Sequence, residues 1–100
     1  MLKHIVMWQF KDEAEGRTKA ENCAYVKSLL EALPAKISFI KKLEVGITSW
    51  PTPMSADMVL VTEFDSKADL DLYAVHPEHI KVSEYVGKIR VSRLVADYEA

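Results

Sequence analysis

Leu2-Lys3-His4-Ile5-Val6-Met7-Trp8-Gln9-Phe10 is the segment from which the fold of this chain can best be inferred. Its period-two pattern predicts a β-strand over residues 2–10. Ile5 and Met7 make the second face of this strand apolar as well, whereas a half-exposed antiparallel strand alternates apolar with polar residues. We therefore expect both faces of the strand to be covered. The first face carries four side chains: His4, Val6, Trp8 and Phe10.

The residues that follow predict one long helix and three more strands. Apolar residues at three- and four-residue spacing predict a helix over residues 13–33, which Pro34 ends. Alternating patterns predict strands over residues 38–48, 57–65 and 88–98. The run Met58-Val59-Leu60-Val61 again leaves no polar face.

A second helix, interrupted by a proline, is predicted between the last two strands. Ser66 is suited to its N-cap, and Asp69 to the reciprocal position of a capping box. Pro77 interrupts the pattern, so the helix restarts over residues 77–86, and Gly87 ends it.

The element order is β-α-β-β-α-β within a single domain over residues 1–100. This order predicts an α+β, ferredoxin-like fold, in which a four-stranded antiparallel sheet carries two helices on one face. Because the other face is also apolar, we expect it to pack on a second copy, giving a homodimeric α/β barrel. A monomer with an apolar groove, or a different partner, is the alternative.

Composition excludes several classes of protein. The net charge of −2 provides no basic surface for nucleic acid. The single cysteine, Cys23, falls at an apolar helical position and is expected to be buried and inert. No secretory leader is recognisable, which predicts a cytoplasmic protein, and no apolar run approaches the roughly 20 residues needed to cross a membrane.

The candidate chemistry lies in Tyr73-Ala74-Val75-His76-Pro77-Glu78-His79. Histidine titrates near neutral pH, so His79 is a candidate for proton transfer, although a histidine bonded to backbone is the alternative. His76, before a proline, is expected to cap the next helix or to contact a partner. The two histidines lack the further ligands of a zinc site, and no cofactor motif is present. Five aromatic residues are expected to form the core by default, and the alternative is that they line an apolar cavity between sheet and helices: Trp8, Trp50, Phe10, Phe39 and Phe64. Such a cavity would suit an aromatic or polyketide-like ligand.

The chain resembles the stress-responsive A/B barrel (Dabb) family along its whole length. Residues 2–11 resemble that family's first strand, Tyr73–His79 its Y-x-x-H-P-x-H signature, and Val95-Ala96-Asp97-Tyr98 its last strand. The resemblance implies a ferredoxin-like protomer in a homodimeric barrel.

The resemblance implies function less closely, because most members have no assigned activity. Among the relatives is olivetolic acid cyclase, which closes a linear polyketide by aldol condensation. By motif position its base falls on His79 and the assisting tyrosine on Tyr73, with a first-strand histidine on His4. The chain is thus similar to a cofactor-independent cyclase. The first hypothesis for function is nevertheless a homodimer of uncertain biochemical role that binds a small hydrophobic ligand. The alternatives are this cyclase-type enzyme, a cofactor-free monooxygenase or decarboxylase, and a purely structural stress protein.

Overall fold

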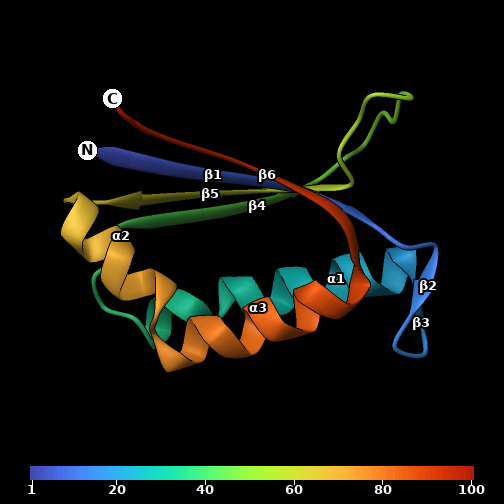
Figure 1. Ribbon diagram of the computed structural model, residues 1–100, viewed down its shortest axis with the longest axis horizontal. Coiled ribbons are helices and arrows are strands. Elements are labelled where there is room, and N and C mark those ends of the chain that lie inside the picture. Colours follow the sequence, from blue (N-terminus) through green and yellow to red (C-terminus); the bar gives the residue numbers. More distant parts are fainter.

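A four-stranded antiparallel sheet in the order β4-β5-β1-β6 carries its helices on one face (Figure 1). The computed structural model describes all 100 residues. The predicted ferredoxin-like fold is confirmed. The sheet strands are β1 (Leu2–Phe10), β4 (Lys42–Ile47), β5 (Met58–Phe64) and β6 (Arg90–Glu99). The helices are α1 (Lys19–Glu31), the 3-10 turn η1 (Leu33–Ala35), α2 (Lys67–Ala74) and α3 (Pro77–Ile89), and a small hairpin joins β2 (Glu13–Ala14) to β3 (Arg17–Thr18).

Strand β1 lies at the centre of the sheet, between β5 and β6. Its alternate residues from Leu2 to Phe10 are buried beneath the helices, as the period-two pattern predicts. They join α1 and α3 in a core of 19 buried hydrophobic residues, which includes Cys23. His4 sits within this face, opposite Thr62 on β5 and Asp97 on β6.

No helix covers the other face of the sheet (Figure 1). Met7 lies there between Val59 and Leu94, and Ile5 lies between Val61 and Ala96. Leu94 is 70% exposed in the single chain. We call this surface the open face; its apolar members are Ile5, Met7, Val59, Val61, Leu94, Ala96 and Tyr98.

The predicted helix over residues 13–33 is wrong in its first six residues. They form the β2–β3 hairpin, whose turn places Glu15 and Gly16 at φ 54° and 76°. The helix begins only at Lys19, because Thr18 caps it and Glu21 returns a side-chain bond to the Thr18 backbone. This capping box is a recognisable sequence pattern, and it gives the correct start of the helix.

A polar network holds the hairpin against the helices. Arg17 Nη1 donates to the Tyr85 hydroxyl at 2.9 Å, and that hydroxyl donates to Asn22 Oδ1 at 2.6 Å. Asn22 Nδ2 in turn donates to the Ala14 carbonyl at 3.1 Å. The Arg17 guanidinium also lies 4.1 Å from the centre of the Tyr25 ring. These long-range bonds override the local helical pattern.

Two other element boundaries differ from the prediction. Strand β4 begins at Lys42 instead of residue 38, because the preceding turn buries Ile37 and Ile40 in the core. Gly87 does not end α3, which continues to Ile89, so the last strand begins at Arg90. A glycine ends a helix by adopting positive φ, and Gly87 does not do so.

The helix starts after β5 follow the sequence more closely. Ser66 caps α2 by accepting from the Asp69 backbone N–H, although Asp69 makes no reciprocal bond. The His76 side chain caps α3, because its Nδ1 accepts from the Glu78 N–H at 3.1 Å. No helix is long and apolar enough to cross a membrane.

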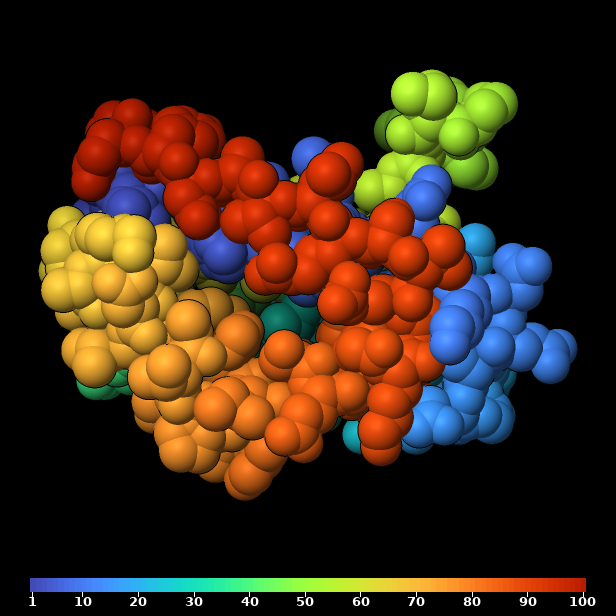
Figure 2. Space-filling view, viewed as in Figure 1, coloured from blue at the N-terminus to red at the C-terminus, as the bar shows by residue number.

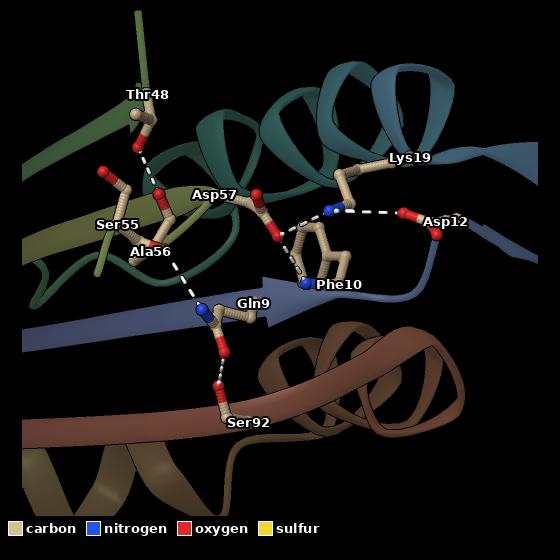
Figure 3. Close-up of polar contacts among 9 residues, drawn as sticks. All are labelled: Gln9, Phe10, Asp12, Lys19, Thr48, Ser55, Ala56, Asp57 and Ser92. Carbon is tan, nitrogen blue, oxygen red and sulfur yellow. Dashed lines mark hydrogen bonds and ion pairs between the residues drawn. The ribbon is translucent and has the colours of Figure 1, made fainter. Parts of the chain in front are cut away.

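The loop between β4 and β5 projects beyond the sheet on the side of the open face (Figures 1 and 2). Trp50 and Met54 in this loop are 87% and 92% exposed. Its base is anchored by Asp57, whose carboxylate accepts from the Phe10 backbone N–H at 2.7 Å and lies 3.5 Å from Lys19 Nζ (Figure 3). The loop therefore has a fixed base and an exposed apolar tip.

Candidate functional site

A cavity of about 270 Å³ lies between the sheet and α3. In Figure 2 the surface is hollowed between the orange α3 and the red β6, with part of α1 visible within. Half of the residues that line this cavity are apolar. The apolar members are Val6, Trp8, Leu30, Leu60, Val82 and Val86, and the others are His4, His79, Ser83, Gly87, Arg90 and Arg93.

The default expectation that the five aromatic residues form the core is confirmed for most of them, and the alternative of an aromatic cavity lining is not. Of the five candidates only Trp8 lines the cavity. Phe10 and Phe64 are buried in the core, and Phe39 packs partly buried against that core. Trp50 lies far outside, because two prolines carry its loop beyond the sheet.

His79 lies in the first turns of α3 with its half-buried ring on the cavity wall. Its Nδ1 is 3.2 Å from the Ala74 carbonyl oxygen. Because a carbonyl can only accept, Nδ1 carries the proton of the neutral ring, and Nε2 is left unprotonated and basic. Burial lowers the pKa of His79; the hydrogen bond to Ala74 opposes this shift, and nearby positive charges, Arg93 among them, add to it. The ring is thus held neutral near pH 7.

Tyr73 packs directly against His79. Their ring centroids are 4.2 Å apart with the planes tilted by 40°, and Phe64 packs on Tyr73 at 5.1 Å. The Tyr73 hydroxyl is buried and has no hydrogen-bond partner. Burial raises the pKa of Tyr73 well above its usual value, so the hydroxyl keeps its proton. The residue itself is not part of the cavity lining.

His4 reaches the same region from β1. Its ring centroid is 6.2 Å from that of Tyr73, so the structure brings the three predicted site residues together. His4 Nδ1 bonds to the Asp97 carboxylate on β6. A carboxylate at Nδ1 orients the ring and leaves Nε2 as the nitrogen free to meet a ligand.

His76 stands apart from this group. Its Nδ1 is occupied by the helix cap, and its ring packs edge-on against Phe39 at 6.4 Å. Of the two roles predicted for it, the cap is the one observed. No group of three His, Cys, Asp or Glu side chains is placed to hold a metal ion.

Sequence reasoning missed Asp97, Arg90 and Arg93. Asp97 and Arg93 share a strand face, but their proximity to His4 and Trp8 depends on the register between β1 and β6. That register joins residues more than eighty positions apart, and no local pattern reports it. Arg90 was assigned to a strand interior because the end of α3 was placed too early.

Comparison with known proteins establishes the family. The family model of the stress responsive A/B barrel domain (Dabb) matches residues 2–100. The chain belongs to the Dabb family. No curated protein sequence matches this Dabb chain.

Solved structures show the same fold. A dimeric protein of unknown function and ferredoxin-like fold from Bacteroides fragilis is 37% identical, with a TM-score of 0.88 over 99% of this Dabb chain and 95% of its own. A dimeric ferredoxin-like protein of unknown function from Jannaschia is 27% identical, with a TM-score of 0.74 over 99% and 98%. A hydroxynitrile lyase from Passiflora edulis is 15% identical, with a TM-score of 0.80 over 97% and 90%, a likeness of fold alone.

Proposed function

We propose that this Dabb protein is a homodimer that binds a small hydrophobic molecule between the sheet and α3. The observation that carries the proposal is the 270 Å³ cavity, which six apolar side chains line. Small-molecule sites are typically concave and apolar with a few placed polar groups, and here the polar groups are imidazoles and guanidiniums. A cytoplasmic location stays a prediction.

The homodimer is supported by the open face. An exposed apolar sheet surface in a protein of this size marks an association site, and relatives of the same fold are described as dimeric. The Leu94→Asp substitution would place a charge on that surface, beside Met7. We expect sedimentation equilibrium to show dimer for the unaltered protein and monomer for this variant, whereas Leu72→Asp, at an exposed site on α2, leaves the dimer intact.

Ligand binding can be measured by the fluorescence of Trp8, which lines the cavity. Only two tryptophans are present, so Trp50→Phe leaves Trp8 as the single fluorophore. Titration with octanol is expected to change the Trp8 emission saturably. Adding Val82→Phe fills the cavity and should abolish the response, whereas Val75→Phe, at an exposed site outside the cavity, should not. An identical response in all three proteins would refute binding in the cavity.

A second candidate function is favoured by the geometry of His79. An unprotonated Nε2 on the cavity wall is suited to remove a proton from carbon beside a carbonyl. Tyr73 packs against the His79 ring with its hydroxyl buried outside the cavity, so it acts as a positioning residue for His79. Proton abstraction of this kind is the cofactor-independent, cyclase-type chemistry that the family resemblance offers as an alternative, with His4 held by Asp97 as a further polar group. The monooxygenase alternative rests on the fold alone.

The catalytic role can be tested without the natural substrate. Exchange of the acidic protons of a β-diketone into heavy water, followed by NMR, reports proton abstraction. A positioned general base contributes roughly 10²- to 10⁴-fold, so His79→Ala should reduce the exchange rate by about that factor. His76→Asn keeps a capping side chain and should exchange normally. Equal rates for both variants would remove His79 from the mechanism.

A further inference from the structure

Two arginine side chains at the cavity have no partner within the chain. Arg90 and Arg93 both line it, and neither makes an ion pair or side-chain hydrogen bond. Most lysines, by contrast, pair with carboxylates, and the third arginine, Arg17, is bonded to Tyr85. Lys3, Lys11 and Lys27 also have no carboxylate partner, but among the cations without an ion pair only Arg90 and Arg93 line this cavity.

The rest of the lining does not neutralise these charges. None of its twelve residues is acidic. The nearest acid on the same face of β6 is Asp97, which is bonded to His4. Trp8 lines the cavity through its ring, whereas its indole Nε1 is fully buried and is not available to a ligand. The cavity thus combines apolar walls with unpaired positive charge.

A stabilising role at a helix end explains the position of only one of the two arginines. Arg90 caps the C-terminus of α3, where a cation interacts favourably with the helix dipole. Arg93 lies three residues further on, opposite Trp8 in the sheet. The C-terminus of a helix presents carbonyl oxygens and no free N–H groups, so an anion near this end must be held by side chains.

We propose that the ligand of this cavity is a small apolar carboxylate. Its hydrocarbon part contacts the apolar walls, and its carboxylate lies against the guanidiniums of Arg93 and Arg90. The planar guanidinium offers paired N–H donors that match a carboxylate in a two-point contact. The inference rests on the proposed function, because it takes the cavity to be a ligand site, and it adds the chemical class of the ligand.

The test compares octanoate with its uncharged counterpart octanamide, using Trp8 fluorescence in the Trp50→Phe protein. Hydrogen bonds to a charged group correspond to roughly tenfold to a hundredfold in affinity, so octanoate should bind tighter by about that factor. The double variant Arg90→Met, Arg93→Met keeps much of the apolar stems and should bind both probes equally. Lys88→Met removes one positive charge from α3 outside the cavity and should keep the preference. Arg93→Lys should keep part of the preference for octanoate over octanamide.

The outcomes separate the two proposals. Equal affinity for both probes in the unaltered protein would overturn the carboxylate inference and leave cavity binding standing. A preference that survives the double variant would overturn the assignment to the arginines. A Trp8 emission that responds to neither probe, nor to octanol, would overturn both proposals.

Discussion

The Tyr73 hydroxyl provides a prediction whose sign depends on the details of the structure. The side chain is 1% exposed, and its hydroxyl has no hydrogen-bond partner. A buried polar group without a partner loses its hydrogen bonds to water on folding and forms none in the protein, which costs about 1–3 kcal/mol. Tyr73→Phe removes the hydroxyl and keeps the ring that packs between Phe64 and His79.

The expected change is therefore opposite to that of most core substitutions. Tyr73→Phe should leave the free energy of unfolding unchanged or raise it by up to about 2 kcal/mol. For a domain of this size each 1 kcal/mol corresponds to roughly 4–8 °C in Tm.

Tyr85→Phe is the matched control. The Tyr85 hydroxyl accepts from Arg17 and donates to Asn22, whose side chain is fully buried. Removing it leaves Asn22 Oδ1 without a donor, so the free energy of unfolding should fall by about 1–3 kcal/mol. One and the same chemical change should thus stabilise the protein, or be neutral, at one site and destabilise it at the other.

Urea unfolding followed by far-UV circular dichroism measures both changes. All proteins should be compared at one protomer concentration, because association contributes to apparent stability. A loss of more than about 1 kcal/mol for Tyr73→Phe would mean that its hydroxyl is hydrogen-bonded, and would refute the reasoning.

Three further predictions follow from individual residues. The pKa of His79 is lower in the folded protein than its unfolded value of about 6.5, so the unfolded chain takes up the proton first as pH falls. Lowering the pH from about 7.5 to about 5 should therefore destabilise the unaltered protein more than His79→Gln, and equal losses in urea unfolding would contradict the shift. Asp57→Ala removes the acceptor of the Phe10 N–H and should lower the free energy of unfolding by about 1.5–3 kcal/mol, whereas Lys19→Met, at a half-exposed ion pair, should lower it by less than about 1 kcal/mol. Gly87→Ala places a methyl group where nothing lies within 4 Å, so helix propensity should raise the free energy of unfolding by about 0.5–1 kcal/mol; a lower free energy of unfolding would show that the site is crowded.

The parts of the fold that depend on short-range patterns could be predicted from the sequence. The alternation from His4 to Phe10 is one such pattern, and the cap at Ser66 is another. The hairpin at residues 13–18 was missed because its residues also fit a helical pattern, and contacts to Tyr85 on a distant helix decide between the two. Gly87 was misread because glycine ends a helix only when its backbone takes positive φ, which the residue type alone does not determine.

The same distinction holds for the candidate site, where some contacts are local in sequence and others depend on strand register. Tyr73 and His79 lie close in sequence, and their contact follows from the break in the helix at Pro77. The Asp97 bond to His4 and the position of Arg93 at the cavity depend on strand register across most of the chain. Register is set by tertiary packing of both sheet faces, so these residues became visible only in the structure.

A small ligand is proposed to occupy the cavity between the sheet and α3. Intermolecular nuclear Overhauser effects between octanol and the methyl groups of isotope-labelled protein test this proposal most directly. We predict cross-peaks to Val6, Val82 and Val86, which line the cavity, and none to Val59 and Val61 of the open face. Cross-peaks confined to Val59 and Val61 would contradict the proposal.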